Sequence, residues 1–312
     1  KKTLPSRWPD AVLIDTVTIA EAPLVLNASG FGELLSIYSA PGDWFLAKEC
    51  GLDDSYAPVL TEILAMCGEG SEEWSGGISQ GDKNATTRLA SALAMRGIVT
   101  GTGGTTASLS GMEHLFSHML DMVAGEKGLP TGLHGAQVGV GSVIRAAMWE
   151  EFCARMEQDG LDTADLFPEV AAMESRVLAA FETLDVSGRI GRECWTRYRT
   201  KLERWHGARA KIEAAFADWA GLRRQHDALV LGSREIASSL HKASAAKRYS
   251  DLTPEVSEEL MRWSVANCQF MRERGTVADL LTFAGWWDDA GIDRVLARVE
   301  GACAAAERKE AA

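Results

Sequence analysis

The sequence lacks closely spaced cysteines. Its six cysteines are scattered between positions 50 and 303 and include no C-x-x-C pair. Paired cysteines are typical of zinc cages and redox motifs, and dense even spacing is typical of disulfide-rich secreted domains. We therefore expect reduced cysteines that fill a core as small apolar residues.

Long apolar runs are also absent. Charged residues interrupt every apolar stretch, as Arg145 does within 137–149, so no run of about 20 apolar residues could span a membrane. The opening residues KKTLPSRWPD contain no apolar region of the kind found in a secretory leader. These features predict a cytoplasmic protein without a membrane partner.

Positive charge is scarce. The chain has 32 Lys and Arg against 44 Asp and Glu, a net charge of −12 with neutral histidine. Such a protein repels nucleic acids, so we expect no nucleic-acid partner. A small anionic ligand would have to be met by a local positive feature, such as a bound cation.

One segment, 194–219, departs from this balance. It interleaves aromatic residues with basic ones such as Arg197 and Arg204, a pattern that can bind phosphates or RNA. Acidic residues including Glu203 and Glu213 offset these charges. We interpret the segment as a solvated helix face.

Strand patterns are nearly missing. Asp10 to Asp15, DAVLID, is a short apolar run bounded by Pro9, and it is the one convincing β-strand. A lone strand needs a partner, so we interpret it as the last strand of a sheet domain otherwise missing from the sequence. The rest predicts helices joined by loops, including a polar glycine-rich loop at 68–82.

Three of the six histidines lie within 21 residues. His114 and His118 are four apart, so they project from one helix face, and His134 begins the next helix. Imidazoles joined by a carboxylate suit zinc, iron or nickel. Helix capping or burial in the core is the alternative, and spacing alone leaves both open.

Two local features surround these histidines. Ser110 and Glu113 fit a capping box at the start of the first helix. Gly139 and Gly141 lie inside the second helix, where glycine costs about 1 kcal/mol relative to alanine. We expect something large to approach that helix closely.

The stretch SGMEHLFSHMLD (110–121), followed by LHGAQVGVG (133–141), resembles the paired motifs of the sn-glycerol-1-phosphate dehydrogenases. These enzymes belong to the iron-containing alcohol dehydrogenase and dehydroquinate synthase-like superfamily. The resemblance runs in order from Lys1 to about Trp287 and includes three further similar stretches. They are PDAVLIDTVTIAEAP (9–23), NASGFGELLSIYSAPGDWFLA (27–47) and FMRERGTVADLLTFAG (270–285).

The resemblance implies a mainly α fold, the helical C-terminal domain of the dehydroquinate synthase-like fold. Residues 24–312 would be the helical metal-binding catalytic domain. Residues 1–23 would be a remnant strand and linker of an α/β nucleotide-binding domain. A homo-oligomer is expected.

The resemblance also implies site residues. Glu33, His114 and His134 would bind one divalent metal, with zinc favoured over nickel or iron, and His118 would be catalytic, contacting substrate near the reacting carbon. Two positions depart from the pattern. Glu33 replaces the usual Asp, and Ile37 stands where relatives often carry a polar residue.

The implied activity is a metal-dependent, NAD(P)-linked interconversion of dihydroxyacetone phosphate and sn-glycerol 1-phosphate. NAD(P) is expected from the family, but the nucleotide-binding loop is not found. GTGGTT (101–106) follows a helix instead of a strand, so we interpret it as a flexible loop and assign no cofactor-binding residue. Two interpretations stay open: the sequence is a fragment of the enzyme, or it is a natural truncation that has lost redox activity or obtains the nucleotide domain from elsewhere.

Two alternatives stay open. A dehydroquinate synthase-like lyase is suggested by Glu33, since those enzymes use Glu there; we rank it second because 31–47 and 111–121 contain no Arg or Lys. A non-enzymatic, degenerate metal-binding paralogue is suggested by the missing nucleotide loop.

Overall fold

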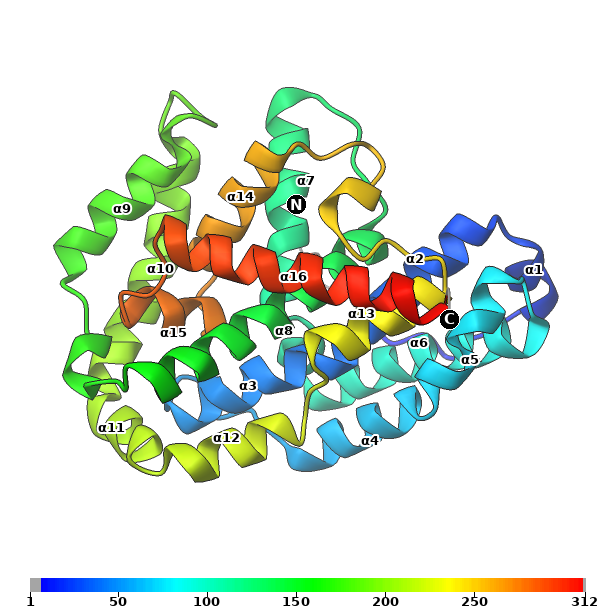
Figure 1. Ribbon diagram of the computed structural model, residues 1–312, viewed down its shortest axis with the longest axis horizontal. Coiled ribbons are helices and arrows are strands. Elements are labelled where there is room, and N and C mark those ends of the chain that lie inside the picture. Colours follow the sequence, from blue (N-terminus) through cyan, green and yellow to red (C-terminus); the bar gives the residue numbers. More distant parts are fainter. Residues whose placement is uncertain (1–6, 311–312) are drawn as a thin grey trace.

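The computed structural model describes residues 7–310, which form helices and connecting loops (Figure 1). The predicted mainly α fold is confirmed. The α-helices are α1 (Thr16–Glu21), α2 (Leu24–Leu34), α3 (Ala40–Glu49), α4 (Pro58–Gly68), α5 (Ser71–Ser79), α6 (Lys83–Gly103), α7 (Met112–Lys127), α8 (His134–Gln158), α9 (Val170–Glu182), α10 (Arg189–Gly207), α11 (Arg209–Ala217), α12 (Trp219–Asp227), α13 (Ser233–Lys242), α14 (Glu258–Asn267), α15 (Val277–Phe283) and α16 (Asp289–Glu310). Short 3₁₀ helices are η1 (Leu35–Tyr38), η2 (Ala107–Leu109), η3 (Thr163–Leu166), η4 (Tyr249–Asp251) and η5 (Cys268–Met271).

The predicted strand at 10–15 is wrong. No strand occurs among residues 7–310, so this segment has no partner for its backbone, and Leu13 is 95% exposed. Its last residue caps α1 instead, because Asp15 Oδ1 accepts hydrogen bonds from the N–H groups of Val17 and Thr18. Residues 1–6 of the predicted linker lie outside the described part of the chain.

The segment expected to be a loop at 68–82 contains a helix. Its residues 71–79 form α5, which begins after Gly70 in a left-handed conformation with φ 66°. Glu72 and Glu73 occupy the first turn, where negative charge favours a helix. The polar composition concealed a helix that buries just one narrow face.

The glycine cluster at 101–106 is likewise half helical. Helix α6 continues to Gly103 and ends at Gly104, whose φ of 64° is the left-handed conformation that terminates helices. The predicted flexible loop is therefore a helix end followed by a short connection.

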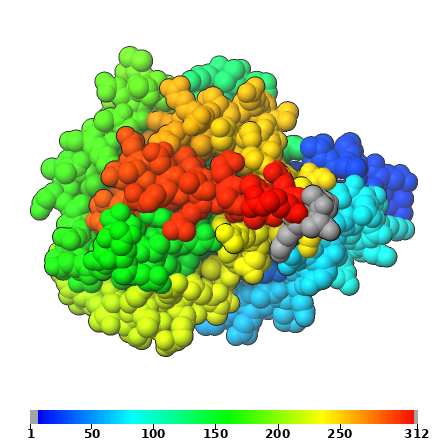
Figure 2. All heavy atoms as spheres, in the orientation of Figure 1, coloured from blue at the N-terminus to red at the C-terminus, as the bar shows by residue number. Residues whose placement is uncertain are grey.

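Helix α8 is the centre of the fold. It packs against α2, α7, α13, α15 and α16, and nearly all of its residues from 135 to 153 are buried. Figure 2 shows α16 crossing one face of the molecule, where it contributes buried Val295 and Val299 to the core. No helix within the described residues is both long and apolar enough to cross a membrane.

Three helices meet at glycine positions. A Cβ built on Gly135 of α8 would lie 2.1 Å from the carbonyl oxygen of Ser29 in α2. A Cβ on Gly141 would lie 2.6 Å from the carbonyl oxygen of Glu113 in α7. The large object expected beside the glycines of α8 is thus the backbone of its neighbours, which glycine allows to come within direct contact.

Replacing Gly141 by alanine is expected to destabilise the protein by about 1–3 kcal/mol, because the new methyl group meets backbone that cannot rotate away. Urea unfolding measures the change. The matched control is Gly125→Ala in α7, where nothing lies within 4 Å of the added Cβ. That control should be neutral or stabilising by up to about 1 kcal/mol. Equal effects of the two substitutions would contradict the close helix contact.

Candidate metal centre

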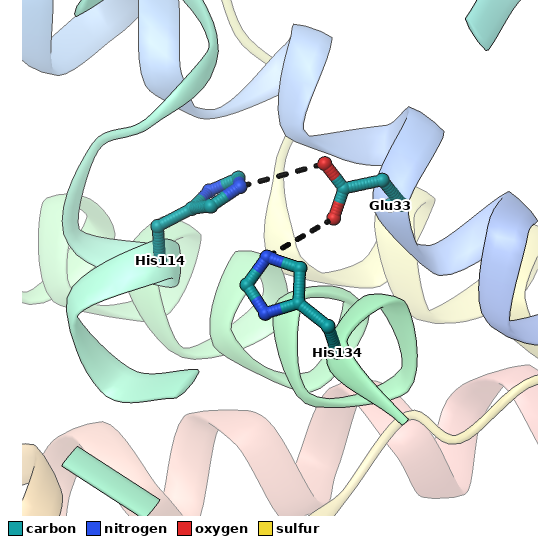
Figure 3. Close-up of side chains that lie close together, drawn as sticks. All are labelled: Glu33, His114 and His134. Carbon is teal, nitrogen blue, oxygen red and sulfur yellow. Dashed lines mark ion pairs between the residues drawn. The ribbon is translucent and has the colours of Figure 1, made fainter. Parts of the chain in front are cut away.

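Three of the predicted site residues converge where α2 ends and where α7 and α8 begin (Figure 3). Glu33 lies near the end of α2, His114 in the first turn of α7, and His134 is the first residue of α8. Glu33 Oε1 is 3.5 Å from His114 Nε2, and Glu33 Oε2 is 3.7 Å from His134 Nε2. The three potential ligand atoms lie within 4.8 Å of one another.

This arrangement fits a divalent cation. Oxygen and nitrogen ligands about 2.0–2.1 Å from a tetrahedral zinc ion are roughly 3.4 Å apart, close to the two observed separations. Glu33 Oε2 is buried without a hydrogen-bond partner, which leaves its lone pairs unsatisfied. One carboxylate and two imidazoles are also the donor set of catalytic zinc sites that keep an open position.

A buried carboxylate orients His114. Glu113 Oε1 lies 2.9 Å from His114 Nδ1, and the Glu113 side chain has no exposed surface. The contact commits Nδ1 to Glu113, so Nε2 is the ring nitrogen that faces Glu33. Carboxylate–histidine pairs of this kind fix the tautomer of metal-binding histidines.

Glu113 also shapes the start of α7. The predicted capping box is half wrong, because Gly111 is the N-cap residue and no side-chain hydroxyl caps the helix. The Glu113 carboxylate does reach back, accepting a hydrogen bond from the Gly111 N–H at 2.7 Å. One carboxylate oxygen therefore serves both the helix start and His114.

A hydroxyl orients His134. Ser117 donates to Gln137 Oε1 at 2.7 Å, which commits its only proton. Its oxygen then accepts from His134 Nδ1 at 2.8 Å. With Nδ1 committed to Ser117, Nε2 is the nitrogen of His134 that faces Glu33.

Arg96 of α6 is a further site residue. It donates to Glu33 Oε1 at 2.9 Å and to Ser36 Oγ at 2.7 Å. Burial favours a raised pKa for Glu33, but the hydrogen bond with His114 and the charge of Arg96 lower it to about 2. Arg96 is 63 positions from Glu33, and nothing in the local sequence predicts the contact.

The same cluster attracts positive charge. Burial alone would lower the pKa of His114, yet the neighbouring carboxylates Glu113 and Glu33 raise it to about 9. The two carboxylates outweigh burial, so the position between them favours a cation.

His118 lies beside His114 and His134. Its ring is stacked on that of His134 with centroids 5.8 Å apart, and it is 6.3 Å from the ring of His114. Glu33, His114 and His118 all line one cleft of ≈ 1210 Å³. The prediction that the two α7 histidines share a face is confirmed, whereas the catalytic role of His118 stays a prediction.

A buried ion pair between Asp43 and Arg145 joins α7 and α8, the helices that carry His114 and His134. Asp43 of α3 accepts a hydrogen bond from the Met112 N–H at 2.8 Å, at the very start of α7. It also accepts from Arg145 of α8, through Nη2 at 3.0 Å, and from the Val277 N–H at the start of α15. Both charged side chains are fully buried, so Asp43 ties four helices together.

His226 of α12, to which the sequence assigned no role, completes this network. Arg145 Nη2 donates to its Nε2 at 2.8 Å, and its ring lies 3.7 Å from that of Trp149. Burial, followed by the charge of Arg145, lowers the pKa of His226 to about 3. The folded protein therefore keeps this histidine neutral.

That neutrality predicts a loss of stability in acid. Unfolded histidine has a pKa of about 6.5, so between roughly pH 6.5 and 3 the unfolded chain binds a proton that folded His226 does not. Its contribution lowers the unfolding free energy by up to about 1.4 kcal/mol per pH unit as pH falls. Urea unfolding of metal-free protein at pH 4.5–5.5 measures this slope. The His226→Asn variant should lose that share of it; an unchanged slope would show that His226 is not the responsible group.

The six cysteines follow the expectation from their spacing. All are free thiols, and all but Cys67 are buried. They contribute apolar volume to the core. Among the described residues, the group of side chains that could hold a metal is Glu33, His114 and His134, which includes no cysteine.

Comparison with known proteins gives no match to a family model but several to curated relatives. Glycerol-1-phosphate dehydrogenase (NAD(P)+) of Aeropyrum pernix is 31% identical over 196 residues, covering 62% of this chain and 53% of the relative. The enzyme of the same name from Haloquadratum walsbyi is 33% identical over 162 residues, covering 50% and 45%. That from Haloarcula marismortui is 36% identical over 137 residues, covering 44% and 37%. The chain spans about half the length of the curated relatives it matches, and over the matched residues it is similar to glycerol-1-phosphate dehydrogenases.

Proposed function

We propose that this chain is the metal-binding catalytic part of an NAD(P)-linked dehydrogenase that interconverts dihydroxyacetone phosphate and sn-glycerol 1-phosphate. The observation that carries the proposal is the convergence of Glu33, His114 and His134 beside a large cleft. The names of the relatives support the substrate and the nucleotide. Residues 24–312 form the proposed catalytic domain, and we assign none of them to nucleotide binding.

The chain supplies the ligands and their orientation. Glu33, His114 and His134 would hold a divalent ion, zinc in the first place and nickel or iron as alternatives. When bound, the ion would supply a Lewis acid for an oxygen of the substrate. Glu113 and Ser117 keep the two imidazoles in the tautomer that offers Nε2.

His118 would act on the substrate itself. It lines the same cleft one helical turn beyond His114, so its imidazole can contact a ligand whose oxygen lies at the metal position. We propose that it hydrogen-bonds the substrate next to the reacting carbon.

The lyase alternative rests on Glu33. Its ranking relied on the lack of Arg and Lys near the ligands in sequence, but the folded cleft receives arginines from α6, α10 and the segment before α15. Charge in the cleft therefore does not exclude a lyase. The relatives named as dehydrogenases keep the dehydrogenase first.

An activity comparison separates the candidates. Purified zinc-loaded protein is assayed for NAD(P)H oxidation with dihydroxyacetone phosphate and for phosphate release from the heptulosonate phosphate used by dehydroquinate synthases. Zinc-dependent oxidation supports the dehydrogenase, and zinc-dependent phosphate release supports the lyase. Stoichiometric zinc without either reaction would fit both the non-enzymatic metal-binding paralogue and a catalytic part that needs a nucleotide-binding domain from elsewhere.

A further inference from the structure

Arginines gather in the cleft beside the metal centre. Five arginines line the cleft, although the formal net charge of the whole protein is −12. They are Arg96, Arg197, Arg204, Arg272 and Arg274. Positive charge is therefore concentrated in this cleft. Such concentrated positive charge needs either carboxylate partners or an anionic ligand.

Two of the arginines have carboxylate partners. Arg96 is paired with Glu33 at 2.9 Å, and Arg204 lies 3.8 Å from Glu273. Both pairs stay within the cleft lining, so they add no net charge to it.

Arg274 is held by the protein in a different way. It donates hydrogen bonds to the carbonyl oxygen of Ser110 and to Thr106 Oγ1, the latter at 3.2 Å. The nearby carboxylate of Asp53, also in the cleft lining, attracts its charge. Arg274 therefore braces the connection before α7.

Arg197 and Arg272 are left without a compensating partner. Both side chains are exposed in the cleft, and neither forms an ion pair or hydrogen bond with any residue of the described range 7–310. Burial and then the like charge of Arg197 lower the pKa of Arg272. Like charges placed together are stabilised by a shared anion.

The cleft has room for such an anion together with a ligand at the metal. Its volume of ≈ 1210 Å³ exceeds the roughly 300–1,000 Å³ of pockets that enclose drug-sized ligands. A three-carbon polyol at Glu33 and His114 would fill a small part of it.

We propose that Arg197 and Arg272 form a phosphoryl-binding site in the cleft that contains the metal ligands. Guanidinium groups bind phosphoryl oxygens through paired, charge-assisted hydrogen bonds, and two of them match a dianionic group. The phosphoryl group can come from a phosphorylated polyol or from the diphosphate of a nicotinamide nucleotide. The identity of the polyol rests on the proposed function. Phosphoryl binding by the two arginines does not require the metal.

Calorimetric titration of three variants tests the site. Arg197→Gln and Arg272→Gln are compared with Arg199→Gln, an exposed arginine of the same helix that is paired with Glu203 and lies outside the cleft lining. The probes are sn-glycerol 1-phosphate, glycerol and NADH, each with zinc-loaded and with zinc-free protein. The first two variants should bind a phosphorylated probe about tenfold or more weakly, while the control binds as the unaltered protein does.

The probes distinguish the sources of phosphate. Weaker glycerol phosphate binding with unchanged glycerol binding assigns the arginines to the substrate, and weaker NADH binding assigns them to the nucleotide. Unchanged affinity for both phosphorylated probes, or an equal loss in Arg199→Gln, would overturn the proposal. Because the zinc-free titrations are scored separately, failure of the metal centre would not be mistaken for failure of the arginine site.

Discussion

Replacing His114 by alanine is expected to abolish stoichiometric zinc binding, with the dissociation constant rising at least about a hundredfold. The substitution removes one of three ligands and leaves Glu113 buried without its imidazole partner. Loss of a surrounding partner alone typically costs tenfold to a hundredfold in metal affinity, so loss of a ligand costs more. Competition with a chromophoric chelator measures the constant, and elemental analysis measures the zinc content.

Two companion variants sharpen the result. Glu113→Gln keeps all three ligands but weakens the hydrogen bond to His114 Nδ1, so a tenfold to hundredfold loss is expected. His206→Ala removes a histidine that contacts the Pro168 carbonyl oxygen far along α10, and it should bind zinc normally. Zinc binding by His114→Ala at the level of His206→Ala would refute the assignment of the ligand.

Replacing Asp43 by alanine is expected to lower the unfolding free energy by about 3–5 kcal/mol. The substitution leaves the fully buried Arg145 without its carboxylate and removes the acceptor for the Met112 N–H. Because α7 begins at Met112, zinc affinity should fall as well. Urea unfolding followed by circular dichroism gives the stability change.

An exposed pair provides the control for this substitution. Asp159 lies 2.6 Å from Arg155 in a partly exposed ion pair one helical turn apart. Asp159→Ala should change stability by less than about 1 kcal/mol. If Asp43→Ala were equally mild, the network around Arg145 would not be holding the helices.

The local placement of the three histidines could be predicted from the sequence. His114 and His118 share a helix face because four residues make about one turn, and His134 follows one loop later. Glu33 was predicted through the resemblance, since no spacing rule connects α2 with α7. The structure brings Glu33, His114 and His134 together and places His118 beside the other two histidines, through helix contacts that Gly135 and Gly141 permit.

The supporting residues could not be predicted in the same way. Arg96 and Glu33 are 63 positions apart, and Asp43 and Arg145 are 102 apart. Arg145 reads in sequence as a charge that interrupts an apolar run, although it is a fully buried partner of Asp43. Such pairings depend on how helices pack, and residue order carries no direct signal of that.

Errors in secondary structure have related causes. The apolar run at 10–15 has the composition of a strand, but a strand needs a neighbour and none exists among residues 7–310. Helix α5 was missed because glycines and acidic residues obscured the narrow face that includes Ser75 and Ile78. In the first segment the missing partner, and in α5 the packing of one narrow face, decided the structure against the local composition.

Diffraction at the zinc absorption edge tests the central claim most directly. Crystals of protein purified with stoichiometric zinc are measured on both sides of the edge, and an anomalous difference map is calculated. The account predicts one strong peak enclosed by the Glu33 carboxylate, His114 Nε2 and His134 Nε2. A zinc peak bound elsewhere, with these three side chains still in contact with one another, would contradict it.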